Sequence, residues 1–376
     1  MKNISILAGT LGAGFIGSFH SYSLAMQKLV KERHDVNLVL KCIADTDQKV
    51  RQEVKERFGY LHDEEHWQKL ITDKQINLFV NAAPNNLHLE PCIAFAENGV
   101  PILCEKPLSG NADDALLMLR SAQKGGIVNQ AAFIHRFIPA IRYMREIIKS
   151  GDLGEPIHFR SSYLMSDYLD PTLKMSWRLD HKVAGLGTFG DLGSHHIDTA
   201  RYLIGEIKDV FATARINVPE VEGKKVEVDD AFASIVTFDS GMVGTIEASR
   251  VAAGYGHFGR IEVDCTKGSL QFQVGKLNEL NIAEGINKGF RTIQVIGPEH
   301  PLSDFWWDGG VQGSHPIGWV ECFVHQMHHF IGAVIGKNNV EPLAASFKDG
   351  YRVAEIADQM VMSWKHNQRV EIKFRE

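Results

Sequence analysis

The 376-residue sequence contains little cysteine and no long hydrophobic run. Its five cysteines are scattered, odd in number and form no C-x-x-C pair, which argues against a disulfide framework or a zinc knuckle. No apolar stretch approaches the ~18 residues of a membrane span, and the amino terminus is a poor secretory signal. We therefore expect a cytoplasmic protein without a membrane partner.

An excess of positive charge is also missing. The sequence has 40 Lys and Arg against 46 Asp and Glu, a net charge of −6, so nucleic-acid binding through a basic surface is not expected. Hydrophobic residues make up 44% of the chain, enough for packed cores and too many for a disordered protein. At about 150 residues per domain, the length predicts two domains or slightly more.

The first part of the sequence alternates between strand and helix patterns. The predicted strands cover residues 4–8, 36–44, 76–82, 101–104 and 127–131, with helical patterns between them, the first from Gly17 to about Arg33. Strands separated by helices predict a doubly wound parallel sheet, the Rossmann α/β architecture. We assign this domain to residues 1–134.

The pattern changes after residue 134. Longer alternating runs cover residues 157–164, 210–218, 231–238, 242–249 and 260–265, and a final helix at 346–366 precedes an edge-strand pattern at 369–374. These runs predict an open, mostly antiparallel sheet in a second α/β domain, residues 135–376. This domain would bind the substrate and mediate self-association.

The sequence Gly12-Ala13-Gly14-Phe15-Ile16-Gly17 is a G-x-G-x-x-G fingerprint directly after a predicted strand and at the start of a predicted helix. The first glycine permits a tight turn, the second lets the backbone approach a pyrophosphate, and the third lets helix and strand pack closely. The helix N-terminus offers unpaired N–H groups to the phosphates. This context favours a dinucleotide site over a plain glycine turn.

Asp45 ends the second predicted strand, where a carboxylate can accept hydrogen bonds from adenosine ribose hydroxyls and repel a 2′-phosphate. It therefore favours NAD, with NADP less favoured. Asp45 lies 28 residues after Gly17, more than the usual ~20, and an ordinary helix cap is the alternative interpretation.

Glu105, Lys106 and Pro107 follow the predicted strand 101–104. The carboxyl ends of parallel strands are where doubly wound sheets place ligands, so Lys106 is aimed at the crevice. A lysine there can polarise a substrate oxygen or join a proton relay. For this tripeptide alone, a solvated lysine beside a turn proline would be the default interpretation.

Asp191 and His195 stand four residues apart and would share a face if the segment is helical. An imidazole is a suitable acceptor for a hydroxyl proton at neutral pH, and a carboxylate nearby can orient it. His195 with His196, and His325 with His328 and His329, raise the alternative of a metal site. Because no ordered set of carboxylate ligands accompanies them, we expect no metal.

Several motifs together carry a resemblance to a known family. They are GAGFIG at 12–17 with His20, APNNLH at 83–88, EKP at 105–107, RFIPA at 136–140, Trp177-Arg178, Asp191 with His195 and Asp198, and DGYR at 349–352. With these motifs the sequence resembles the Gfo/Idh/MocA oxidoreductases over nearly its whole length. The resemblance implies NAD(P) bound between a Rossmann domain and an open-sheet domain, and hydride exchange with a sugar, polyol or related alcohol.

The resemblance also implies roles for individual residues. Lys106 would lie beside the nicotinamide and the substrate, and Asp191 and His195 would form the D-x-x-x-H pair, with His195 as general base. The loop of Pro84, Asn85 and His88 would line the cofactor, and Glu105 would lie near the nicotinamide ribose. The family often has a polar residue two positions before the arginine of its R-F-x-P-A motif, whereas this chain has Ile134 there and His135 next.

We therefore expect an NAD-dependent enzyme that oxidises a secondary hydroxyl of a sugar or glycoside, possibly C3 of a pyranose, to a ketone. Tyr163, Trp177 and Arg178 supply aromatic and polar groups for a sugar pocket, and Trp306 and Trp307 serve packing, an interface or aglycone binding. The alternatives are an inositol or cyclic-polyol dehydrogenase and, from another class, a catalytically silent NAD-binding regulator. A homo-oligomer is expected.

Overall fold

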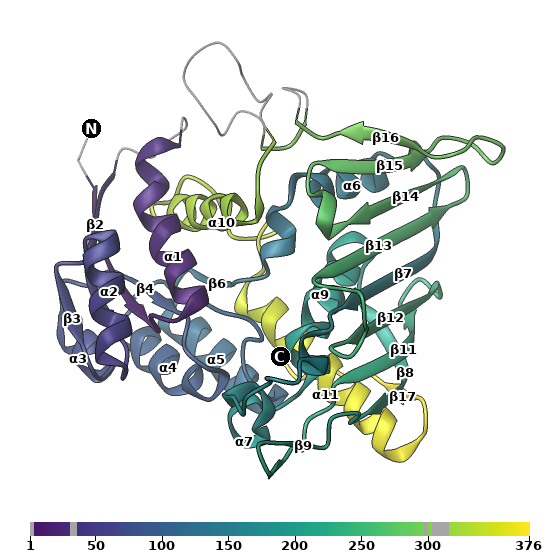
Figure 1. Ribbon diagram of the computed structural model, residues 1–376. Helices are drawn as coiled ribbons and strands as arrows, with labels where there is room; N and C mark the ends of the chain where they lie inside the picture. The colour runs from purple at the N-terminus through teal and green to yellow at the C-terminus, as the bar shows by residue number, and fades with distance from the viewer. Residues whose placement is uncertain (1–3, 31–35, 297–299, 303–315) are drawn as a thin grey trace.

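The structure is a computed structural model and describes residues 4–30, 36–296, 300–302 and 316–376. It has two lobes, each built around one sheet (Figure 1). The first lobe holds the amino-terminal sheet, and the second holds a larger sheet packed on helices. No helix in these ranges is long and apolar enough to cross a membrane.

The first sheet is fully parallel, with the strand order β3-β2-β1-β4-β5-β6. Its strands are β1 (Ile4–Leu11), β2 (Val36–Ala44), β3 (His62–Glu64), β4 (Leu78–Asn81), β5 (Ile102–Cys104) and β6 (Asn129–Ala131). This order is that of a doubly wound dinucleotide-binding sheet. The Rossmann prediction is confirmed, and β2 has the predicted bounds; β3 was not predicted.

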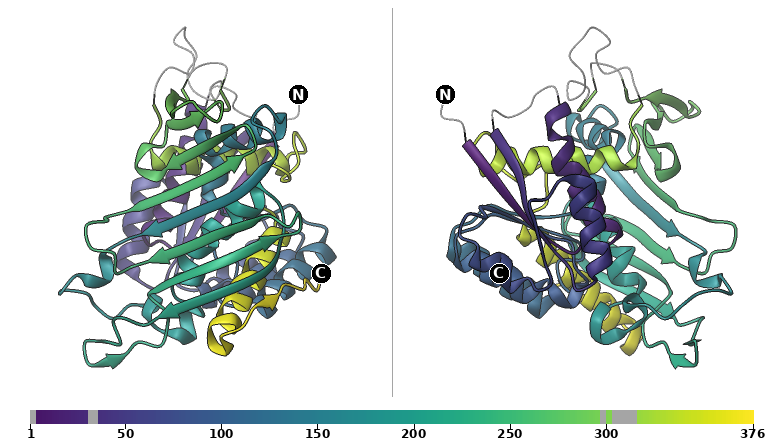
Figure 2. Two further views of the ribbon diagram at one scale, coloured as in Figure 1. Left: turned by 90° about the vertical axis from the view of Figure 1, so that its right-hand side faces the viewer. Right: turned by 60° about the vertical axis from the view of Figure 1, so that its left-hand side comes forward.

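Helices cover both faces of this sheet (Figure 2, right). The amino-terminal ones are α1 (Phe15–Met26), α2 (Gln48–Phe58), α3 (Gln68–Thr72), α4 (Leu89–Glu97) and α5 (Ala112–Gly125). Two helices from the other end of the chain complete the layers. Met327 and Phe330 of α10 (Trp319–Val334) join the core of α1 and α2, and Tyr351 of α11 (Phe347–His366) joins that of α4 and α5.

The second sheet has nine strands in the order β16-β15-β14-β13-β7-β12-β11-β8-β17. They are β7 (Pro156–Leu164), β8 (Ile207–Arg215), β11 (Ala231–Phe238), β12 (Val243–Ser249), β13 (Phe258–Cys265), β14 (Gly268–Gln273), β15 (Glu279–Ala283), β16 (Arg291–Gln294) and β17 (Val370–Glu371). Only the β7–β12 pair is parallel, which confirms the mostly antiparallel prediction. The terminal pattern forms an edge strand, β17, as expected.

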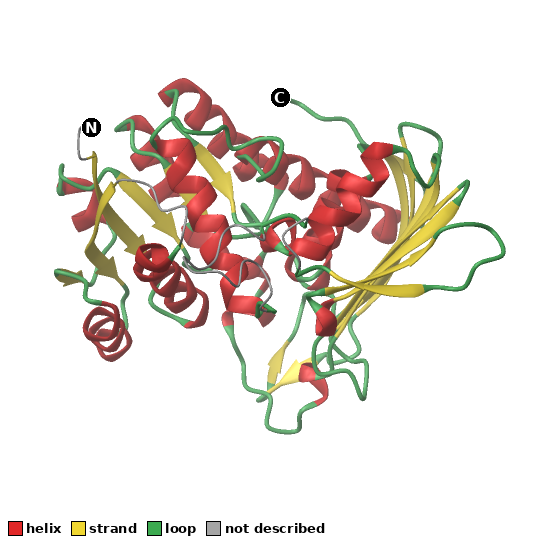
Figure 3. Ribbon diagram, turned by 90° about the horizontal axis from the view of Figure 1, so that it is seen from above, coloured by secondary structure: helices red, strands yellow, loops and turns green. Residues whose placement is uncertain are grey.

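One face of the second sheet packs on helices, and the other faces outward (Figure 2, left; Figure 3). The inner helices include α6 (Pro139–Ser150), α9 (Gly193–Leu203) and α11. Buried and exposed residues alternate along β11, as expected for a sheet with one covered face. A short hairpin of β9 (Glu220–Val221) and β10 (Lys224–Lys225) lies outside both sheets.

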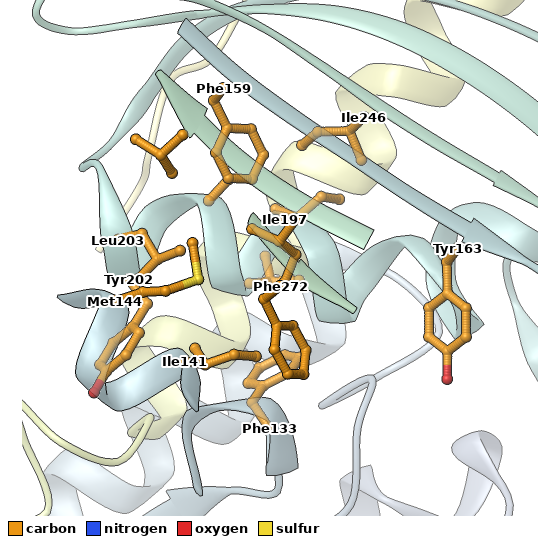
Figure 4. Packing of buried hydrophobic residues seen from close by; sticks show 14 of the residues in the cluster. Phe133, Ile141, Met144, Phe159, Tyr163, Ile197, Tyr202, Leu203, Ile246 and Phe272 are labelled. Atoms are coloured by element: carbon orange, nitrogen blue, oxygen red, sulfur yellow. The ribbon is translucent and has the colours of Figure 1, made fainter. Parts of the chain in front are cut away.

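The core of this lobe fills the space between the sheet and its helices (Figure 4). Phe159 of β7 and Ile246 of β12 meet Ile197 of α9, and all three are fully buried. Tyr163 stands apart from the closely grouped side chains, with its hydroxyl turned away from them. The carboxyl end of β7, which carries Tyr163, therefore lies at the edge of this core, on the side of the space between the lobes.

Two predicted helices differ from those observed. The first ends at Met26 instead of continuing to Arg33. Asp191 and His195 lie on successive helices, α8 (Thr188–Asp191) and α9, with Leu192 between them, and not on one continuous helix. The segment contains Gly187, Gly190 and Gly193, which weaken a continuous helix.

Candidate active site

The glycine fingerprint forms a tight turn between β1 and α1. A Cβ at Gly12, which has φ +92°, would lie 2.5 Å from the Ala82 carbonyl oxygen, and one at Gly17 would lie 1.9 Å from the Gly12 oxygen. Gly14 is the N-cap of α1 and has open space where a Cβ would stand. The turn therefore needs Gly12 and Gly17 for its own packing and leaves Gly14 open to a ligand.

Asp45 reaches this turn directly. Its Oδ2 accepts a hydrogen bond from the Ala13 N–H at 2.7 Å, and its Oδ1 accepts one from the Asp47 N–H at 2.9 Å. The long segment after Gly17 thus does not displace the carboxylate from the fingerprint. Of the other two fingerprint residues, Phe15 is 75% exposed and Ile16 is partly buried against the core of the second lobe.

Of the three predicted cofactor residues in the loop after β4, one is partly exposed and two are buried. Pro84 is partly exposed. Asn85 is buried and donates from Nδ2 to the Ala184 oxygen at 2.9 Å, at the end of α7 (His181–Ala184) in the other lobe. His88 is fully buried, and its ring nitrogens lie against backbone oxygens, including that of Ala83 at 2.9 Å. His88 therefore contacts the backbone of its own loop and of the segment after β5.

Glu105 is also more buried than its predicted place beside a ribose requires. Its Oε1 pairs with His20 Nε2 of α1 at 2.7 Å, and its Oε2 accepts the Lys106 N–H at 3.0 Å. Glu105 is 7% exposed and His20 is 1% exposed. This pair ties the first helix to the end of β5 and fixes the backbone of Lys106.

The two lobes meet at Lys106 and Asp191. Lys106 Nζ donates to Asp191 Oδ1 at 2.7 Å and to the Asp191 carbonyl oxygen at 3.0 Å. The two residues are 85 positions apart in the sequence, and both side chains keep some exposure. The structure therefore brings together two of the three predicted catalytic residues.

Asp191 is held by three cations. Its Oδ2 pairs with Arg250 and lies 3.6 Å from Arg178 Nε, while Oδ1 takes Lys106. Burial alone raises the pKa of Asp191, but Lys106, Arg250 and Arg178 together hold it well below its usual value. Both carboxylate oxygens are thus committed to cations, and Asp191 stays ionised.

Sequence reasoning missed Arg250, which directly follows β12. Its guanidinium also pairs with Asp167 and lies over the Tyr168 ring, 4.9 Å from the centroid. The available signal was a charged residue at the end of an alternating strand, which is common in surface loops. Only the fold shows that this arginine is buried against Asp191.

His195 lies beside this ion cluster without a hydrogen bond to Asp191 among the described contacts. It is 6% exposed, and its Nδ1 is buried with no partner. Burial, the charge of Lys106 and the neighbouring His135 lower the pKa of His195 well below its ordinary value. The imidazole is therefore uncharged at neutral pH and able to accept a proton.

A small pocket opens next to Asp191. Asn85 of the first lobe lines it, together with aromatic and charged side chains of the second lobe. These are Tyr168, Trp177, Arg178, Asp191 and Arg250. The Arg178 guanidinium covers the Trp177 ring at 4.4 Å from its centroid. The cavity has a volume of about 10 Å³, and the flat rings and hydrogen-bonding groups around it are of the kinds that contact polar ring-shaped ligands.

Tyr163 does not line this pocket as predicted. It is 2% exposed, and its hydroxyl is hydrogen-bonded to His257 Nε2 at 2.5 Å. Burial and the charge of Asp191 raise the pKa of Tyr163. It packs behind His195, with ring centroids 6.1 Å apart. Trp306 and Trp307 lie outside the described residues.

The second group of histidines that suggested a metal makes hydrogen-bonding contacts with oxygen atoms of the chain. His325 Nδ1 lies 3.3 Å from the Phe137 oxygen, His328 Nδ1 3.2 Å from Gln27 Oε1, and His329 Nε2 3.0 Å from the Val340 oxygen. Within the described ranges, no group of three or more His, Cys, Asp or Glu is placed to hold a metal ion.

Similarity to known proteins agrees with this geometry. The chain is 34% identical over 385 residues to the levoglucosan dehydrogenase of Pseudarthrobacter phenanthrenivorans, covering 96% of both chains. It is 32% identical to the myo-inositol 2-dehydrogenase of Thermotoga maritima over 70% of this chain and 73% of that one.

A solved structure of levoglucosan dehydrogenase in complex with NADH and levoglucosan superposes with a TM-score of 0.92 at 33% identity, over 98% of this chain and 99% of that one. Residues 6–133 match the oxidoreductase family with an NAD-binding Rossmann fold, and residues 141–271 match the GFO/IDH/MocA C-terminal domain. The chain belongs to the Gfo/Idh/MocA family of NAD-binding oxidoreductases.

Proposed function

We propose that this protein oxidises a secondary hydroxyl of a sugar or glycoside to a ketone, with NAD as cofactor. The observation that carries the proposal is the meeting of Lys106 and Asp191 at 2.7 Å, with the uncharged His195 beside them. These groups lie where β5 of the first lobe faces the second lobe. Ligands of doubly wound sheets bind at this end of the strands.

The fingerprint residues fit NAD. Gly14 leaves an open position at the N-terminus of α1, whose N–H groups favour phosphate. Asp45 uses two acceptor positions on backbone N–H groups, and a carboxylate offers about four, so it can still take ribose hydroxyls. Pro84, Asn85 and Glu105 would support the nicotinamide end. Bound NAD supplies the hydride acceptor.

Residues of the chain itself bind the substrate and accept its proton. Lys106 Nζ donates a hydrogen bond to the substrate hydroxyl oxygen and stabilises negative charge that develops there. His195 accepts the hydroxyl proton. Asp191 contacts both Lys106 and Arg250 and holds these cations in place. The aromatic and arginine side chains of the adjacent pocket orient the sugar ring.

A sugar or glycoside is favoured by the levoglucosan dehydrogenase relatives, which match nearly the whole chain. We propose C3 of a pyranose as the oxidised carbon. The second candidate is a cyclic polyol such as an inositol, favoured by the relatives that include myo-inositol 2-dehydrogenase. Offering glucosides, levoglucosan and inositols with NAD, and following absorbance of the reduced cofactor, separates the two.

Substituting the reacting groups tests the mechanism. Lys106→Ala should lower kcat/KM by ~100-fold or more, and His195→Ala by ~100- to 10,000-fold, with NAD affinity retained in both. The exposed residues Lys69 and His66 provide the matched controls Lys69→Ala and His66→Ala, which should be unaffected. Retained turnover in both site variants would refute the assignment. A wild-type protein that binds NAD but oxidises none of these substrates would favour a silent NAD-binding regulator.

We also propose that a second copy of the chain covers the open face of the larger sheet. Phe211, Ile235 and Val243 are 38–49% exposed on that face, and Phe211 and Ile235 are direct cross-strand neighbours. Light scattering after size-exclusion chromatography should show an oligomer that Ile235→Glu weakens. A wild-type monomer would contradict this.

A further inference from the structure

His135 contacts His195 more closely than any other ring does. It lies on the short 3-10 helix η3 (Ile134–Phe137) after β6 and is fully buried. The two imidazole rings stack with centroids 4.5 Å apart and an interplanar angle of 20°. His135 directly follows Ile134, the position at which the sequence departs from the usual pattern before the R-F-x-P-A motif.

His195 lacks the partner that normally orients a histidine base. A carboxylate or a backbone carbonyl usually accepts a hydrogen bond from the other ring nitrogen of such a histidine. Here Nδ1 of His195 is buried without a partner, and the oxygens of Asp191 are occupied by cations. Because the χ2 torsion of histidine has broad minima, something else must hold the ring plane.

We propose that His135 is a positioning residue for His195, holding its imidazole plane by ring stacking in place of a hydrogen bond to Nδ1. The inference rests on the proposed role of His195 as the base. Phe133 meets the His195 ring at 6.4 Å with its plane at 80°, and Tyr163 lies 6.1 Å away. Of these three aromatic contacts, the stack with His135 is therefore the closest restraint on the His195 ring.

Both rings of the stack are uncharged at neutral pH. Burial, with smaller contributions from the neighbouring His196, His257 and Lys106, lowers the pKa of His135 well below its ordinary value. His196 and Lys106 act on His195 in the same direction. Asp191 alone among the groups facing His195 opposes them, and Tyr163 stays protonated because burial raises its pKa.

The unpartnered nitrogens do not indicate a metal site. Both ring nitrogens of His135 and of His196 lack hydrogen-bond partners, as does His195 Nδ1. The His135 ring stacks on His195, whereas His196 meets it at an interplanar angle of 65°. The described part of the chain holds no His, Cys, Asp and Glu group placed for a metal.

Two substitutions separate stacking from imidazole chemistry. His135→Phe keeps a flat ring and removes both unpartnered nitrogens, whereas His135→Leu removes the flat ring. We expect His135→Phe to retain kcat within a few-fold, with a Tm equal to or above wild type. His135→Leu should lose ~10- to 100-fold in kcat with an unchanged Kd for NADH. The acid limb of its pH profile should move up toward ~6.5 because His195 is less shielded.

Three results overturn the proposal. One is a His135→Leu enzyme with wild-type kcat and pH profile. Another is a His135→Phe enzyme as impaired as His135→Leu, since the imidazole itself would then be required. The third is an ordinary pKa of ~6.5 for His195 in the wild-type protein. It is measured by NMR on protein labelled at its histidine rings, and the His195 resonance is assigned by its loss in His195→Ala.

The proposed function fails separately. If His195→Ala keeps full turnover, His195 is not the base, whatever the state of the stack. If His195→Ala is inactive and His135→Leu is fully active, the base assignment stands and the positioning role falls.

Discussion

Adding one methyl group at either of two glycines in the fingerprint turn should have opposite consequences for folding and for NAD binding. A Cβ at Gly17 would stand 1.9 Å from the Gly12 carbonyl oxygen, so the backbone must move. Overpacking of this kind typically costs ~1–3 kcal/mol, and each 1 kcal/mol lowers Tm by ~2–4 °C in a domain of 150–250 residues. Gly17→Ala should therefore unfold several degrees below wild type.

Gly14→Ala places its methyl group in open space. The residue has φ −66° and ψ −162°, which alanine can adopt, and no atom lies within 4 Å of its Cβ position. The fold should lose at most ~1 kcal/mol, because alanine is a weaker N-cap than glycine. The methyl group would, however, occupy the approach of the pyrophosphate. We expect the Kd for NADH to rise at least ~10-fold, equivalent to ~1.4 kcal/mol.

Thermal unfolding without cofactor and fluorescence titration with NADH measure the two effects separately. Gly289→Ala is a neutral control, since Gly289 is exposed and has nothing within 4 Å of its Cβ position. A Gly14→Ala protein that binds NADH with wild-type affinity would show that the pyrophosphate does not lie over this turn. A Gly17→Ala protein with unchanged Tm would show that the close approach to Gly12 is wrong.

Three further predictions concern selectivity, acid stability and helix capping. Asp45→Ala should raise the ratio of kcat/KM with NADP to that with NAD by ~10-fold or more, because a repelling carboxylate is lost; an unchanged ratio in steady-state assays would place the ribose elsewhere. Burial lowers the pKa of His196 to about 3, so its contribution to stability is present above ~6.5, its pKa in the unfolded chain, and is lost as pH falls toward 3. Between pH 7.5 and 5.5 this histidine lowers the free energy of unfolding by ~1.4 kcal/mol. In denaturant titrations, His196→Phe should therefore lose ~1.4 kcal/mol less stability over this range than wild type. Equal losses of stability in the two proteins would contradict the prediction. Asp229 accepts hydrogen bonds from two backbone N–H groups at the start of α8. Asp229→Ala should therefore lower the free energy of unfolding, measured by urea titration, by ~2 kcal/mol or more. A loss below ~0.5 kcal/mol would show that these bonds contribute little.

Local sequence determined the elements of the first lobe. The strand Val36–Ala44 was predicted with its observed bounds, because an apolar β-branched run between polar segments is a local signal. The fingerprint could be interpreted for the same reason: Gly12 and Gly17 meet each other and Ala82 across one turn. Strand-to-helix turns of this kind depend on sterics within a few residues, and the sequence contains that information.

The partners of the site residues depended on tertiary structure. Lys106 and Asp191 could be predicted as separate candidates, but their contact spans 85 positions. No local signal indicated that Arg250 pairs with Asp191 or that His135 stacks on His195. The burial of His88 and Tyr163 removed two residues from the surfaces on which they were expected.

The sequence by itself therefore determined the class of fold, the nucleotide turn and which polar residues end the strands. The tertiary structure decided which of these groups meet, which are sealed in the interior, and that α10 and α11 from the end of the chain complete the first lobe. The physical reason is that periodicity and turn chemistry act over a few residues. A contact between lobes exists only when the packing of two separate cores brings its partners within reach.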